Sequence, residues 1–293
     1  MRIITLSDHV SDMIKKIEQE WETAKQAARQ KWERANQATQ KAHQDALVER
    51  QRRLKHLGQS LSDTWRNKQY GKLLFTLIEF IKLSFSSPPT PSVEQPARVI
   101  PEPAELEIWR GGKRGEDYVK STLSSILDDN WTYLGGYRSS KGEIDAVLIG
   151  EPGVFAIEIK NLRGDVSIDG DKWTRDIYDR WDNLKERADP IADGKRSPSQ
   201  QLNDAAVPLQ NSLSHFDISK IYRLVVLAYE GSKIVSAGNL TIDAVVLPNE
   251  LSQTLWNIGQ MKLNAERRDQ IVRLIQDNHR QFEVWEQSQR RTA

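Results

Sequence analysis

The stretch KGEIDAVLIGEPGVFAIEIKN, residues 141–161, decides how we expect this chain to fold. It contains two short apolar runs, 144–149 and 154–159, which are typical of buried strands. The residues between them, Gly150-Glu-Pro-Gly153, predict a turn. The two runs are therefore expected to be neighbouring, antiparallel strands of one hairpin.

Two charged residues interrupt the second of these strands. Glu158 and Lys160 are two positions apart, so their side chains point to the same face. Burying an acid and a base in an apolar strand costs free energy unless another interaction offsets it. An ion pair could offset this cost, and a divalent metal could offset more, because it binds carboxylates, water and phosphate.

These residue types suit the metal-dependent cleavage of a phosphodiester bond. We expect Asp145 and Glu158 to bind Mg²⁺ or Mn²⁺, with the main-chain carbonyl of Ile159 as a third ligand. The metal would polarise the phosphate and lower the pKa of a bound water, while Lys160 would stabilise the developing charge. The spacing D-x(12)-E-x-K also arises by chance, so a charged pair on a solvent-facing strand is the alternative.

Helix and strand patterns follow one another on both sides of the hairpin. Helices are predicted at 114–128, 198–214 and 265–287. Further strands are predicted at 131–134, 223–229 and 242–247, with a second hairpin at 166–174 around Asp169-Gly-Asp171. This order predicts an α/β fold with a mixed β-sheet flanked by helices.

The residues before this domain have a different pattern. Residues 8–68 have the alanine-rich, heptad-like spacing of a helix that breaks near Gly58 or before Gly71. Six of the eleven prolines lie between residues 88 and 103, which is typical of a linker. We therefore expect a coiled-coil-like helical region at 1–86, a linker at 87–106 and the nuclease-like domain at 107–293. The helices could join copies of the chain in a homo-oligomer.

The most apolar part of the helical region is KLLFTLIEFIKLSF, residues 72–85. Its apolar residues form one broad helical face, and the run is too short to span a bilayer. One interpretation is an interfacial membrane helix or a docking helix. The other, which such a face more often indicates, is a buried helix that closes the N-terminal bundle.

Composition narrows the possible environments and chemistries. The chain has no cysteine, which excludes disulfides, thiolate metal sites and a cysteine nucleophile, and it fits a reducing, cytoplasmic environment. Neither a signal peptide nor a transmembrane segment is expected. Net charge is +6 over residues 1–87 and −5 over the remainder. This asymmetry suggests a polyanionic partner or self-association, although a charge bias of this size more often reflects only a solvated face.

Three motifs together resemble the NERD (nuclease-related) domain of the PD-(D/E)xK nuclease superfamily. They are Gly115-Glu116, Gly142-Glu-Ile-Asp145 and Val154-Phe-Ala-Ile-Glu-Ile-Lys-Asn161, within roughly residues 109–230. The resemblance implies a restriction-endonuclease-like core, DNA as the substrate, and a first-helix Glu116 that reaches the metal site. Alternatively, Glu116 is a first-turn acid favoured by the helix dipole.

The same resemblance implies a site glutamine at the start of the helix that begins at Pro198. Gln201 matches the Pro-x-x-Gln spacing and would position the substrate or the lysine, while Gln200 is one step off and is the alternative. Both could also be surface residues. The connection 176–197 is longer and more charged than the resemblance requires, and its basic and aromatic residues suit either nucleic-acid contact or a solvated loop.

The sequence therefore predicts a Mg²⁺-dependent deoxyribonuclease. Two alternatives stay open. The first is a catalytically silent module that binds nucleic acid or a protein partner. The second is a membrane-surface scaffold that carries a nuclease-like passenger domain.

Overall fold

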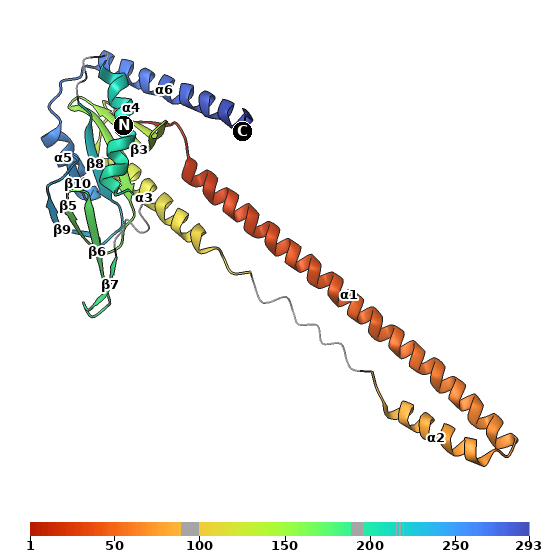
Figure 1. Ribbon diagram of the computed structural model, residues 1–293. Coiled ribbons are helices and arrows are strands. Elements are labelled where there is room, and N and C mark those ends of the chain that lie inside the picture. The colour runs from red at the N-terminus through yellow and green to blue at the C-terminus, as the bar shows by residue number, and fades with distance from the viewer. Residues whose placement is uncertain (89–99, 189–195, 215, 217, 219, 293) are drawn as a thin grey trace. The chain divides into compact units, whose positions relative to one another are not determined.

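The structure is a computed structural model that describes residues 1–88, 100–188, 196–214, 216, 218 and 220–292 (Figure 1). The chain divides into two compact units. The first unit consists of Met1–Lys16 and Ala104–Ala293, and the second consists of Ile17–Pro103. The candidate site lies entirely in the first unit.

A six-stranded sheet forms the centre of the first unit. Its strands, in order across the sheet, are β1 (Arg2–Thr5), β2 (Thr132–Ser139), β3 (Gly142–Gly150), β4 (Gly153–Lys160), β8 (Tyr222–Leu227) and β10 (Ala244–Val246). The pairs β2–β3 and β3–β4 are antiparallel, whereas β1–β2, β4–β8 and β8–β10 are parallel. The predicted mixed sheet is confirmed, and the β3–β4 hairpin lies in its middle.

Helices cover both faces of this sheet. One apolar cluster joins alternate residues of β3 and β4, such as Val147 and Ala156, to α4 (Pro198–Ser214) and α6 (Ala265–Thr292). The other joins the intervening residues, such as Leu148 and Phe155, to α3 (Ala104–Ile126) and α5 (Leu251–Ile258), which follows the short helix η2 (Pro248–Glu250). Because neighbouring strand residues point to opposite faces, both faces of the hairpin are buried.

A second sheet has the strand order β7-β6-β5-β9. Its strands are β5 (Asp165–Asp169), β6 (Lys172–Tyr178), β7 (Leu184–Ala188) and β9 (Lys233–Gly238). The predicted hairpin at 166–174 is confirmed as β5–β6, but β7 and β9 were not predicted, because most of their residues are exposed and give no apolar alternation. The β6–β7 hairpin extends away from the other strands (Figure 1).

The expected connection at 176–197 therefore contains strand rather than loop alone. Its residues 176–178 end β6 and residues 184–188 form β7, whereas residues 189–195 lie outside the described part of the chain.

The N-terminus departs from the expected helical region. Residues 2–5 form a strand that pairs with β2, because β2 offers an open edge and Arg2-Ile-Ile-Thr5 is rich in β-branched residues. The helix predicted from residue 114 begins at Ala104, since packing outweighs the low helix propensity of Gly111 and Gly112. The last residues of the expected linker therefore belong to α3, and residues 89–99 lie outside the described residues.

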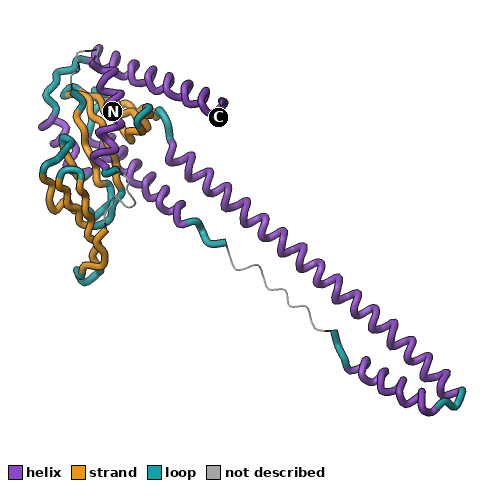
Figure 2. The backbone as a smooth tube through the Cα atoms, in the orientation of Figure 1, coloured by secondary structure: helices purple, strands orange, loops and turns teal. Residues whose placement is uncertain are grey.

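The second unit contains most of α1 (His9–Arg66) and all of α2 (Tyr70–Phe85), which Figure 2 shows as separate helices. The break falls before Gly71, one of the two predicted places, and Lys68 adopts a positive φ of 53° there. Arg50 donates hydrogen bonds to the carbonyls of Leu83 (3.1 Å) and Ser84 (2.8 Å) and so satisfies the end of α2.

The interpretation of residues 72–85 as a buried helix is wrong. No residue of α2 is buried, and Leu74, Phe75 and Phe85 expose 63%, 66% and 85% of their surface. The described side chains of α1 cover the other side of α2 only in part, so its broad apolar face is left exposed. Among the described residues, no helix combines the length and the apolar character needed to cross a membrane.

Candidate active site

Asp145 lies where the pairing between β3 and β4 ends. The last pair in the register is Ala146 with Ile157, so Asp145 comes opposite Glu158 one step further along. Instead of another backbone pair, the Asp145 carboxylate accepts the main-chain N–H of Ile159 at 2.6 Å. This hydrogen bond holds the carboxylate against β4, beside the charged residues of that strand.

Glu158 and Lys160 form a close ion pair on β4, in which the glutamate is buried and the lysine is half-buried. The distance from Lys160 Nζ to Glu158 Oε1 is 2.5 Å, and Glu158 is only 4% exposed. The alternative of a solvent-facing charged pair is therefore wrong. Burial, and then the nearby charge of Asp145, raise the pKa of Glu158 to about 8. Burial lowers the pKa of Lys160, but the charges of Glu158 and Asp145 outweigh it and leave this pKa above its ordinary value.

Helix α4 brings Gln201, rather than Gln200, to this ion pair. Lys160 Nζ donates a hydrogen bond to Gln201 Oε1 at 3.1 Å, and Gln201 Nε2 donates to the carbonyl of Arg196 at 2.6 Å. The Gln200 side chain instead accepts the main-chain N–H of Ser197 at 3.0 Å, at the start of the helix. Gln201 thus holds the lysine, whereas Gln200 satisfies a free amide of the helix end.

The carbonyl of Ile159 faces the same side as the Asp145 carboxylate. The next carbonyl, that of Lys160, accepts the N–H of Ala228 at 2.9 Å on the β8 side. Successive carbonyls of a strand point in opposite directions, so that of Ile159 points toward β3. Two carboxylates and one main-chain carbonyl therefore lie at the end of the hairpin, where their oxygens could hold a hard cation.

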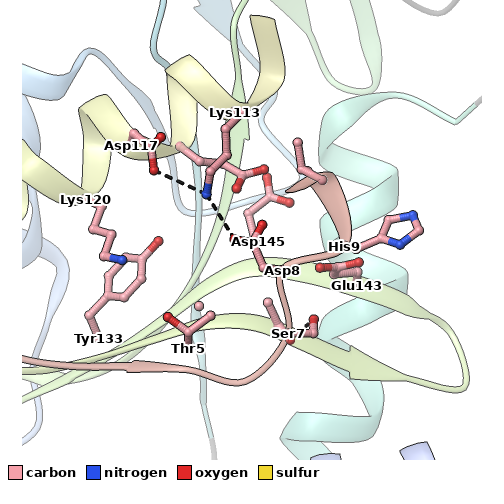
Figure 3. Close-up of a pocket in the computed structure, with 14 residues that line it drawn as sticks. Thr5, Ser7, Asp8, His9, Lys113, Asp117, Lys120, Tyr133, Glu143 and Asp145 are labelled. Carbon is pink, nitrogen blue, oxygen red and sulfur yellow. Dashed lines mark hydrogen bonds and ion pairs between the residues drawn. The ribbon is translucent and has the colours of Figure 1, made fainter. Parts of the chain in front are cut away.

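Glu116 of α3 lies near enough to Asp145 for the charges of the two carboxyl groups to interact. Burial, followed by the charge of Asp145, raises the pKa of Glu116 to about 8. Glu116 and Asp145 line a small cavity of ≈ 50 Å³. Figure 3 shows this cavity with Asp145 labelled. Glu158 and Gln201 line a larger cavity of ≈ 480 Å³, in which Asp145 also takes part. Asp145 therefore lies between the two cavities.

In the part of the chain that the structure describes, no three or more His, Cys, Asp or Glu side chains are grouped closely enough to hold one metal ion. This agrees with the placement of Glu116 and Glu158 in different cavities. The ligands expected from the sequence, Asp145, Glu158 and the Ile159 carbonyl, include only two carboxylates.

Several residues of the site were missed in the sequence. Glu143 lies two positions before Asp145 on the same face, and burial followed by the charge of Asp145 raises its pKa to about 7. Its spacing was a signal that could have identified it. Lys113, Asp8 and His9 also line the cavities, but nothing in their local sequence marks them.

The fold and the site define an α/β domain whose central hairpin ends in a buried glutamate beside a half-buried aspartate and a half-buried lysine. Residues 111–228 match the family model described as nuclease-related domain (NERD), so this part of the chain is a NERD domain, as the resemblance predicted. The match includes Glu116, Asp145, Glu158, Lys160 and Gln201. No curated protein and no solved structure matches the chain.

Proposed function

We propose that this NERD domain hydrolyses phosphodiester bonds of DNA with the help of Mg²⁺ or Mn²⁺. The observation that carries the proposal is the meeting of Asp145, Glu158 and Lys160 in a largely desolvated site inside the nuclease-related segment. A pair of carboxylates beside a lysine provides both metal ligands and a cation for a phosphate.

The electrostatics of the site favour a divalent cation. Burial is the main cause that raises the pKa values of Asp145 and Glu158, and in Glu158 the charge of Asp145 adds to it. Lys160 compensates only part of this negative charge. Asp145, Glu158 and the carbonyl of Ile159 would hold the ion, since their oxygens are the ligands that Mg²⁺ prefers. The bound ion would supply Lewis-acid polarisation of a phosphate oxygen and a more acidic water.

The cationic residues of the site would contact the phosphates of the substrate, and Gln201 would position Lys160. Lys160 is placed to stabilise the negative charge that develops on the phosphate, because its ammonium lies beside the carboxylates. Gln201 keeps that ammonium in place through its amide oxygen. Lys141 and Arg196 line the larger cavity and supply cations for neighbouring phosphates of the strand.

Cleavage of plasmid and linear DNA by the purified full chain tests this proposal. With Mg²⁺ or Mn²⁺ we expect wild-type cleavage, and a loss of at least ~10²-fold in Asp145→Asn and in Lys160→Ala, comparable to the loss of one charge-stabilising group. Lys172→Ala is the matched control, because Lys172 is an exposed lysine of β6. A wild-type protein that cleaves with none of these metals, or variants that cleave like the control, would contradict the proposal. Binding without cleavage would instead support the silent module.

The exposed face of α2 favours a second role that is separate from catalysis, namely attachment of the helical region to a membrane surface. Apolar helical faces of this size partition into the interface of a bilayer. We expect the full chain to float with anionic vesicles and the double variant Leu74→Ser/Phe85→Ser to stay behind, while Thr76→Ser, on the partly covered side of α2, floats like wild type. If wild type does not float but forms concentration-dependent dimers, and the double variant does not form them, the α2 face serves self-association instead.

A further inference from the structure

The N-terminal segment is built into the nuclease-related domain although it lies far outside residues 111–228. Strand β1 pairs in parallel with β2, from Arg2 opposite Thr132 to Thr5 opposite Gly135. The ladder continues one residue further, where the N–H of Leu6 donates to the carbonyl of Gly135 at 2.8 Å. The pairing of β1 with β2 therefore fixes the position of the residues that follow β1 on the domain.

Ser7 fixes the chain at the point where it leaves the sheet. Its hydroxyl donates a hydrogen bond to the carbonyl of Gly136 at 2.8 Å. Gly136 has a positive φ of 70°, and a Cβ there would lie 2.3 Å from the carbonyl oxygen of Ser7. This close approach needs a glycine on the β2 side.

Asp8 anchors the next step of the chain to α3. One carboxylate oxygen accepts the N–H of Ser11 at 3.1 Å and so caps α1. The other lies 3.4 Å from Lys113 Nζ, which also pairs with Asp117 at 3.3 Å. Figure 3 shows this lysine between Asp8 and Asp117. Asp8 thus ties the start of α1 to the helix that carries Glu116.

His9 follows directly and lies on the wall of the larger cavity. Its ring packs edge-on against Trp109 of α3, with 5.7 Å between the ring centroids. Figure 3 shows the His9 side chain pointing away from Lys113. The cavity that His9 lines also contains Asp145, Glu158 and Gln201. The imidazole is exposed and adds a donor to the cations Lys141 and Arg196 that line the same cavity.

We propose that the N-terminal segment forms one wall of the nucleic-acid site and that His9 donates a hydrogen bond to a backbone phosphate of the bound strand. This inference rests on the proposed function, because it assigns the substrate of the same cavity. A nucleic-acid strand that passes over the carboxylates of Asp145 and Glu158 meets His9 on one wall of the cavity. It meets the cations Lys141 and Arg196 elsewhere on the rim. Such phosphate contacts position a strand without reading its bases, so the contact is expected for any sequence.

The experiment compares His9→Ala with His56→Ala in the full chain. His56 is the matched control, because it is also an exposed histidine of α1 but lies in the second unit. Affinity for a fluorescent DNA oligonucleotide is measured in EDTA, where metal-dependent cleavage cannot occur, and KM and kcat are then measured with Mg²⁺. We expect His9→Ala to weaken binding about tenfold and to raise KM similarly, as for the loss of one hydrogen bond to a charged group. We expect His9→Arg, which keeps a donor, to restore most of the affinity.

The two readouts separate this inference from the proposed function. If wild type binds DNA but does not cleave it, the proposed function fails, while the loss of binding in His9→Ala still supports the contact. If His9→Ala binds like His56→Ala, or if wild type does not bind DNA at all, the inference is overturned. An unchanged melting temperature of His9→Ala shows that its effect does not come from a loss of folding.

Discussion

Replacing Glu158 by glutamine should stabilise the metal-free protein at alkaline pH. The folded protein holds the pKa of Glu158 at about 8, against 4.5 for an unperturbed glutamate, because burial and then the charge of Asp145 oppose ionisation. The folded state therefore binds this proton more tightly than the unfolded state does. The contribution of Glu158 to the free energy of unfolding is therefore largest below a pH of about 4.5, and it is lost as the pH rises through about 8. A glutamine cannot ionise, so the variant avoids this loss.

The size of the effect follows from the same two pKa values. Their difference corresponds to roughly 5 kcal/mol of unfolding free energy as an upper limit. This difference already includes the attraction of Lys160, and a side-chain amide does not replace every contact of the carboxyl group, so the gain is expected to be smaller than this limit. We therefore expect Glu158→Gln to gain on the order of 1–3 kcal/mol over wild type at pH 9, or about 3–10 °C in melting temperature. At pH 5 the two proteins should differ little.

Thermal unfolding in EDTA at pH 5 and pH 9, with and without added Mg²⁺, measures this effect. Mg²⁺ at a hundred times its Kd should stabilise wild type by about 2.7 kcal/mol, whereas Glu158→Gln should respond much less. Glu151→Gln, an exposed glutamate in the turn of the same hairpin, is the control. If Glu158→Gln is no more stable than Glu151→Gln at pH 9, the raised pKa and the reasoning built on it are wrong.

Three further changes test other parts of the structure. Gln201→Ala removes the amide oxygen that holds Lys160, and it should lower kcat about tenfold or more with little change in melting temperature. Gln200→Ala should cost about 1 kcal/mol of stability and leave kcat unchanged. Equal kcat values in the two variants would refute the assignment of Gln201 to the site. Gly136→Ala places a Cβ against the Ser7 carbonyl and should detach β1, seen as faster amide exchange in residues 2–6, and unchanged exchange would count against this packing. Trp173→Ala empties a fully buried position under the second sheet and should cost about 3–5 kcal/mol in urea unfolding, so a loss below 1 kcal/mol would contradict the burial.

Local pattern in the sequence was enough to predict most of the central sheet. The hairpin β3–β4 has two apolar runs and a glycine-bounded turn, and strands buried on both faces leave this signal within the chain itself. Strands β7 and β9 left no such signal, because they are stabilised by pairing with β6 and β5 while their side chains stay exposed. Backbone pairing between distant segments does not constrain residue type strongly.

The sequence by itself also determined which strands carry the residues of the candidate site. Asp145, Glu158 and Lys160 were identified because a charged residue in an apolar strand costs free energy that another interaction must offset. Only the tertiary structure decided that Gln201 rather than Gln200 meets the lysine, since one residue along a helix turns the side chain by about 100°. It also placed Glu116 in a cavity different from that of Glu158.

The N-terminal residues mark the limit of what the sequence determined. Asp8 and His9 precede Asp145 by more than a hundred positions, and the helix that follows them suggested a separate arm. Their place at the site depends on the open edge of β2, which accepts β1, and on Gly136, which lets Ser7 approach. An edge strand is paired through backbone groups that every residue carries, so only the folded chain shows that this segment belongs to the domain.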